Sequence, residues 1–133
     1  KASSSVLKSM EESKSSRTDT GKRGEELAKT YLEKQGYTIV EQNWRTRYGE
    51  IALVAKKGDL LVVVEVRTRV GEQFGMPEET LNFQKRKRIF WNATAYLAKS
   101  KGFNRCRIDA VCVVLGKNQE LKRIAHYENI VSG

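Results

Sequence analysis

The chain has 133 residues, of which 25 are Lys or Arg and 16 are Asp or Glu, so its formal net charge is +9. This length predicts one domain, and 39% hydrophobic residues allow a buried core, which excludes collagen-like and low-complexity disordered classes. No apolar run approaches the ~18 residues of a membrane helix. Cys106 and Cys112 lie too far apart on one short strand to form a disulfide. We therefore expect a cytoplasmic protein with free thiols and no membrane partner.

Basic residues are concentrated after position 20. Residues 1–20 hold four basic and three acidic residues, so residues 21–133 carry +8 of the net charge. This distribution favours a polyanionic partner such as nucleic acid, because each neutralised phosphate releases counterions. The alternative is a solvated basic surface that only increases solubility. The clusters are Arg45/Arg47, Arg67/Arg69, Lys85-Arg86-Lys87-Arg88 and Arg105/Arg107.

A Ser-rich segment precedes the first predicted element. Residues 1–20 have few apolar side chains, so we expect a flexible N-terminal tail, or a short amphipathic helix, followed by one domain over residues 21–133. Thr20 is expected to cap a helix that ends at Gly36. Its apolar stripe consists of Leu27, Ala28, Tyr31 and Leu32.

Three strands are predicted next, over residues 37–45, 49–55 and 60–67. The last two form a hairpin around Lys57-Gly58-Asp59. Because side chains of a strand alternate between faces, Glu50, Ala52 and Val54 are expected to share one face. A hairpin closed there places Glu50 opposite Glu65 and Ala52 opposite Val63 on that face. A shift of two residues keeps this arrangement, whereas a one-residue slip separates the two sets.

A second helix is predicted to begin at Pro77 and to end at Lys101-Gly102, because Pro and acidic residues favour a first helical turn. Residues 105–115 and 120–126 follow as strands. The order α-β-β-β-α-β-β predicts a small α/β domain with a mixed sheet.

Two acids attract attention. Glu65 interrupts an otherwise apolar strand, and a buried carboxylate is costly unless a cation, a metal ion or hydrogen bonds meet it. An ion pair with Arg67 or Arg69 and a metal-ligand role are equal alternatives. On the first helix, Glu25 lies at the edge of the apolar stripe whereas Glu26 points away. Glu25 can therefore face inward, or it merely stabilises the positive end of the helix.

The motifs of residues 21 to about 130 are Gly24-Glu25-Glu26-Leu27-Ala28, Asn43-Trp44-Arg45, Gly49-Glu50-Ile51, Val64-Glu65-Val66-Arg67-Thr68-Arg69, Lys85 with Arg88-Ile89, and Arg107-Ile108-Asp109. In this order and spacing the chain resembles the YraN-type family of small bacterial proteins. Those proteins resemble archaeal Holliday-junction resolvases and the wider PD-(D/E)XK nuclease superfamily.

The resemblance implies a restriction-endonuclease-like core and an endonuclease site that holds Mg²⁺ or Mn²⁺ and hydrolyses DNA, branched DNA included. Glu25 matches the helix acid and Glu65 the third-strand acid, while Arg67 occupies the place of the superfamily lysine. Glu50 is a further metal-ligand candidate. A homodimer is suggested by analogy to junction resolvases.

The chain departs from the family pattern on the second strand. Where the family reads Gly-Glu-Ile-Asp-Leu-Ile, this chain has Ala52 in place of the Asp, and a methyl group cannot bind a metal. A natural loss of cleavage and a deliberate Asp-to-Ala replacement both explain Ala52, and the intact neighbours favour replacement. We therefore expect this chain to cleave poorly.

Lys85 and Arg88 share one helix face and match the basic pair of the family, so they are expected to contact phosphate. The candidate nucleic-acid-binding residues are Arg45, Arg47, Arg69, Lys85 and Arg88. Trp44 either stacks on an exposed base or belongs to the core, and the core is the commoner place.

The remaining polar motifs are weaker. Asp109 matches the family motif but is expected to form a structural ion pair with a neighbouring arginine. His126 has no second imidazole that would make a zinc site.

The sequence thus predicts a DNA-binding endonuclease fold with an impaired site. The alternatives are a non-catalytic nucleic-acid-binding or assembly module on a nuclease scaffold, and a basic RNA-associated protein.

Overall fold

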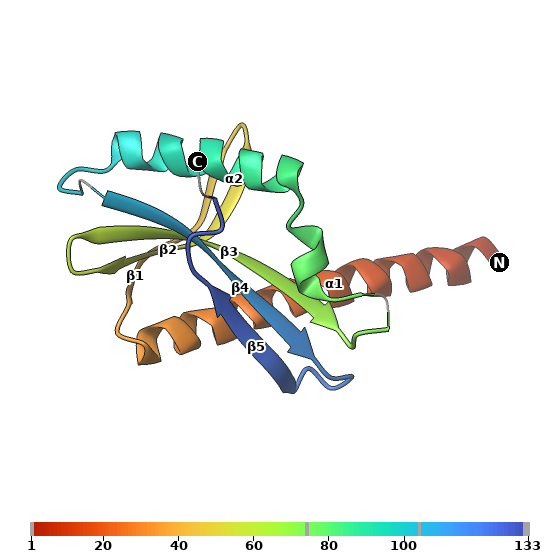
Figure 1. Cartoon of the computed structure of the whole chain (residues 1–133). Coiled ribbons are helices and arrows are strands. Elements are labelled where there is room, and N and C mark those ends of the chain that lie inside the picture. The colour runs from red at the N-terminus through yellow and green to blue at the C-terminus, as the bar shows by residue number, and fades with distance from the viewer. Residues whose placement is uncertain (1, 74, 104, 132–133) are drawn as a thin grey trace.

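The computed structural model describes the backbone of residues 2–73, 75–103 and 105–131, and the side chains of those residues from Thr18 onwards. Figure 1 shows a central sheet with one helix on each face. The elements are α1 (Ala2–Lys34), β1 (Thr38–Thr46), β2 (Gly49–Lys57), β3 (Leu60–Val70), a 3₁₀ turn η1 (Pro77–Thr80), α2 (Phe83–Lys99), β4 (Arg105–Leu115) and β5 (Leu121–Tyr127). The predicted α/β class and element order are confirmed.

The sheet has the strand order β1-β2-β3-β4-β5 and is mixed, as expected. The pair β3–β4 is parallel and the other three pairs are antiparallel. A parallel pair needs a crossover connection, and η1 and α2 supply it. The central strands are apolar on both faces because helices cover both.

Two apolar clusters hold the helices to the sheet. Ala28 and Leu32 of α1 pack with Leu53, Val62 and Val64 on one face. On the other face, α2 contributes the buried side chains of its inner stripe to a cluster with central-strand residues. These α2 residues are Ile89, Ala93 and Tyr96, and their strand neighbours include Val54, Leu61 and Val63.

Both helices begin elsewhere than predicted. Helix α1 runs through Thr20 back to Ala2, so the predicted cap at Thr20 is wrong, and the segment expected as a flexible tail or short helix is the first part of α1. Helix α2 begins at Phe83 because the side chain of Asn82 accepts a hydrogen bond from the Lys85 N–H at 2.9 Å, a typical N-cap. Pro77 opens the separate turn η1.

The register of the β2–β3 hairpin also differs from the prediction. Val54 pairs with Val63 and Leu53 with Val64, a shift of two residues, and the pairing extends only from Leu53 to Lys57. Glu50 is therefore not paired opposite Glu65.

The predicted common face of Ala52 and Val54 is wrong as well. Ala52 and Leu53 both belong to the cluster under α1, whereas Ile51 and Val54 belong to the cluster under α2. The alternation is interrupted where β2 is not yet paired with β3. Opposite this point, between the pairs Gln42–Leu53 and Trp44–Ile51, Asn43 has a left-handed φ of 53°.

Cys106 and Cys112 are free thiols, as predicted. Burial raises the pKa of Cys112 to about 12. None of the helices in the described ranges is long and apolar enough to cross a membrane.

Candidate functional site

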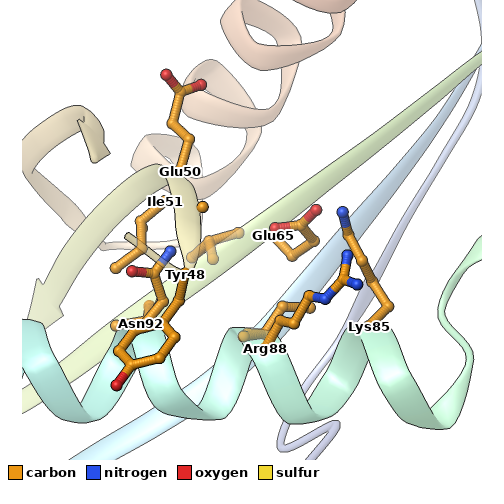
Figure 2. A pocket seen from close by; sticks show the side chains of 11 residues that line it. Tyr48, Glu50, Ile51, Glu65, Lys85, Arg88 and Asn92 are labelled. Carbon is orange, nitrogen blue, oxygen red and sulfur yellow. The ribbon is translucent and has the colours of Figure 1, made fainter. Parts of the chain in front are cut away.

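A pocket of about 160 Å³ lies where β2 begins, between β3 and α2. Its charged lining consists of Glu50 from β2, Glu65 from β3, and Lys85 and Arg88 from α2. Figure 2 shows Lys85 and Arg88 rising from α2 towards the Glu65 carboxylate, whereas the Glu50 carboxylate points away from them. The volume is below that of a drug-sized ligand site and suits a small anionic group such as phosphate.

Glu65 is the central acid of this pocket. Its side chain is 12% exposed, and Arg67 Nε lies 3.4 Å from its Oε1. Burial raises the pKa of Glu65, the positive charges of Arg67 and Lys85 oppose that shift, and the carboxylates of Glu25 and Glu50 add to it. The ion pair between Glu65 and Arg67, expected as one alternative, is therefore present. The negative charges of Glu25 and Glu50 also act on the Glu65 carboxylate.

Glu25 and Glu50 are joined by an amide that the sequence did not single out for this role. Asn43 Nδ2 donates to Glu25 Oε1 at 3.1 Å and to Glu50 Oε1 at 3.3 Å. Glu25 is half-buried and Glu26 is exposed, so the predicted orientation of the helix acids is confirmed. Arg45 Nε pairs with Glu50 Oε2 at 3.1 Å.

The bridging residue Asn43 has a left-handed backbone conformation, with a φ of 53°. Asn tolerates that conformation better than most residues. The sequence signal was therefore an Asn in the middle of a predicted strand.

Ala52 lies buried on the α1 side of the sheet, next to Ala28 and Leu53 in the same cluster. It does not line the pocket, and its methyl group has no oxygen that could bind a metal. Across the described residues, no three His, Cys, Asp or Glu side chains come together as a group that could hold a metal ion. The donor set of the chain as it stands does not fit a divalent cation, which requires several convergent oxygen ligands.

The predicted phosphate contacts separate into two groups. Lys85 and Arg88 line the pocket with Glu65. Arg45 and Arg47 are exposed beside it, and Arg47 donates to Tyr48 Oη at 2.8 Å. Arg69 is half-buried near the end of β3 and does not line the pocket.

One polar residue of the pocket, Asn92, and its hydrogen-bond partner Thr46 were missed. Asn92 is buried on α2, and Thr46 Oγ1 donates to its Oδ1. Thr46 Oγ1 also accepts the Tyr48 N–H at 3.0 Å, which fixes the β1–β2 turn next to the pocket. An Asn on the otherwise apolar stripe of the second helix was the available signal.

Trp44 belongs to the core, the commoner of its two alternatives. Its ring packs edge-on against Tyr96 at 4.9 Å between centroids, and Lys99 Nζ lies 5.1 Å from the Trp44 ring.

Asp109 has the structural role expected of it. The fully buried carboxylate receives Arg107 through Nε and Nη2, each at 2.8 Å, and His126 Nε2 lies 2.8 Å from Oδ2. Arg107 also donates to Tyr37 Oη at 2.6 Å. This network ties β4, β5 and the start of β1 together and lies apart from the pocket lining.

The fold is that of an α/β protein with a five-stranded mixed sheet and a helix on each face. The chain belongs to the family described as "Uncharacterised protein family UPF0102", whose model matches residues 24–113 and which is the YraN family that the motifs resemble.

Relatives within this family support the assignment over most of the chain. A UPF0102 protein of Pelotomaculum thermopropionicum is 42% identical over 110 residues, covering 82% of this chain and 92% of the relative. One of Rhodococcus opacus is 44% identical over 97 residues, covering 72% and 82%. One of Thermodesulfovibrio yellowstonii is 37% identical over 113 residues, covering 85% and 96%.

Proposed function

We propose that this protein binds DNA through the Glu65 pocket, and that the pocket is one part of a phosphodiester-hydrolysing endonuclease site whose second-strand ligand position, Ala52, lies on the α1 side of the sheet. The observation that carries the proposal is a half-buried carboxylate faced by two cations from α2 in a pocket of phosphate size. Lys85 and Arg88 are placed to hold a phosphate, while Arg67 holds the Glu65 carboxylate in the pocket.

The three acids Glu25, Glu50 and Glu65 support this function over a basic surface that only increases solubility. The chain carries +9 overall, yet Glu25, Glu50 and Glu65 lie close enough for the first two to raise the pKa of the third. Carboxylates that repel one another in this way destabilise the fold unless a cation binds between them. The third-strand acid, the helix acid and position 52 are the three ligand positions that the family resemblance implies.

The cofactor proposed for an intact site is Mg²⁺ or Mn²⁺. In this chain the acids are held by Asn43, Arg45 and Arg67, and Ala52 contributes no oxygen. Cleavage is therefore expected only when an oxygen ligand is restored at position 52.

The test is metal-dependent cleavage of linear duplex DNA and of four-way-junction DNA by the chain with Ala52 and by Ala52→Asp. We expect Ala52→Asp to cleave faster by about two orders of magnitude or more, because a bound divalent ion contributes several kcal/mol of charge stabilisation. Preference for the junction would support action on branched DNA.

Two matched variants control this experiment. Ala52→Asn adds a side chain of the same size without the charge and is expected to stay inactive. Glu65→Gln in the Ala52→Asp background is expected to abolish the restored activity. Equal cleavage by the chain with Ala52 and by Ala52→Asp would contradict the site model.

The second candidate is a non-catalytic nucleic-acid-binding module. It is favoured because the described residues include no group of three acids, His or Cys that could hold a metal ion, and because the Ala52 methyl group is buried. It predicts salt-sensitive DNA binding and no cleavage even by Ala52→Asp.

A further inference from the structure

Helix α2 has a second exposed face, whose residues do not line the Glu65 pocket. Phe83, Phe90 and Trp91 form an aromatic patch on this face, and their exposed fractions are 80%, 44% and 44%. Arg86 and Lys87 lie between them, so the five residues follow an i, i+3, i+4, i+7, i+8 stripe. The stripe lines a hollow of about 380 Å³, whose other wall is Ile130 and Val131.

The aromatic patch is continuous with the Glu65 pocket through Tyr48. Tyr48 lines that pocket together with Lys85 and Arg88. Its ring lies nearly parallel to the Trp91 ring, with centroids 6.4 Å apart and an angle of 29° between planes. Phe90 and Trp91 are in edge contact at 5.6 Å. A surface therefore leads from the phosphate-binding cations across Tyr48 and Trp91 to Phe90.

We propose that the aromatic patch stacks on unpaired bases of a nucleic acid whose backbone is held at the Glu65 pocket. This inference rests on the proposed function and names its substrate class, nucleic acid with a single-stranded segment. Aromatic faces alternating with cations are what single-strand binding surfaces use, because every base has a π-face and every nucleotide a phosphate. Arg47, whose guanidinium lies 5.0 Å from the Tyr48 ring centroid, adds positive charge at the junction of the two surfaces.

Charge favours this occupant over a second copy of the chain. A two-fold symmetric contact brings the same patch of both copies together, so Arg86 and Lys87 would lie against their own counterparts. Nucleic acid instead neutralises them, in keeping with the net charge of +9.

Three DNA probes test the proposal: a mixed-sequence single strand, an abasic strand of the same length, and the fully paired duplex. We expect the single strand to bind about tenfold tighter than the abasic strand, since stacking contributes most of that difference. Trp91→Ala should remove the preference, whereas Leu121→Ala on β5, a residue of similar exposure outside the patch, should keep it.

A Trp44→Phe background leaves Trp91 as the single tryptophan, and its fluorescence should be quenched by the base-containing strand but not by the abasic one. Phe83→Ser supplies a second patch variant at a highly exposed position, where misfolding is not expected.

Equal binding of the single strand and the abasic strand would overturn the proposal. Sedimentation that shows a dimer lost in Phe83→Ser, with strand binding unchanged, would assign the patch to a second copy and overturn it too. Failure of the proposed function looks different: none of the three probes would bind in a salt-sensitive way, and Lys85→Ala would change nothing.

Discussion

The buried carboxylate of Asp109 and the half-buried carboxylate of Glu65 differ in how their charges are met. Burial raises the pKa of Asp109, but hydrogen bonds from His126, Arg107 and the Asn129 N–H outweigh it and hold the pKa below its ordinary value of 3.8. Glu65 has the ion pair with Arg67, and its pKa is raised. Strongly held charge is typical of a structural acid, whereas a raised pKa in a pocket is a common feature of functional acids and agrees with the role proposed for Glu65.

The lowered pKa of Asp109 predicts how the stability of the fold depends on pH. A carboxylate whose folded-state pKa is lowered stabilises the fold above its unfolded-state pKa, and this contribution is lost as the pH falls through the folded-state pKa. We expect Asp109→Asn to lower the free energy of unfolding at neutral pH by about 3 kcal/mol, because it leaves Arg107 without its buried partner. The difference from the native chain should shrink below about pH 4.

Urea unfolding at neutral and acidic pH measures both effects. Glu128→Gln is the matched control, because Glu128 pairs with the same Arg107 at 3.5 Å but is 60% exposed. That variant should change stability by less than about 1 kcal/mol. A difference for Asp109→Asn that stays constant across the pH range would contradict the prediction.

At the scale of elements, the position of α1 depends on one close approach to β3. A Cβ atom added at Gly24 would collide with the side chain of Thr68. Gly24 therefore lets α1 lie near the sheet, and the next residue, Glu25, is brought to the Asn43 amide that also holds Glu50.

We expect Gly24→Ala to lower the free energy of unfolding by about 1–3 kcal/mol through overpacking. Thr68→Ala in the same chain should recover most of this loss, since the colliding atoms are removed. Gly21→Ala is the control on the same helix, because nothing lies within 4 Å of its added Cβ. That change should stabilise by roughly 0.5–1 kcal/mol.

Chemical denaturation of the single and double variants forms a double-mutant cycle. Additive effects of Gly24→Ala and Thr68→Ala would show that the contact does not position α1.

Helix α2 carries two surfaces beside its buried stripe of Ile89, Ala93 and Tyr96. The Asn82 cap starts the helix at Phe83, and from there Lys85 and Arg88 turn towards the pocket while Phe83, Phe90 and Trp91 remain exposed.

At the scale of the whole molecule, the net charge of +9 predicts salt-sensitive DNA binding. The logarithm of the association constant should fall linearly with the logarithm of salt concentration. We expect Lys85→Ala to reduce the magnitude of this slope by about one, because one phosphate contact is lost.

Lys117→Ala is the matched control, since Lys117 is an exposed lysine in the turn between β4 and β5 and does not line the pocket. Fluorescence anisotropy over a salt series measures both slopes. Equal slopes for the two variants would mean that DNA binds by general charge and not at the pocket. The homodimer suggested by analogy stays a prediction.

The sequence by itself determined the order of the helices and strands and the orientation of several side chains. The strand bounds 105–115 were predicted correctly, and Glu25 lies inward while Glu26 is exposed. These features depend on short-range periodicity, which is present in the local sequence. The free thiols of Cys106 and Cys112 were predicted in the same way, because two residues six positions apart on one strand are too distant to form a disulfide.

Only the tertiary structure decided how these parts form a site. The register of the β2–β3 hairpin differs from the predicted one by two residues. Ala52 lies on the α1 side of the sheet, where β2 is not yet paired with β3. Asn43 bridges Glu25 and Glu50 across 18 and 7 residues of sequence, and Tyr48 meets Trp91 from another element. Such contacts depend on the packing of distant segments, which no local pattern specifies.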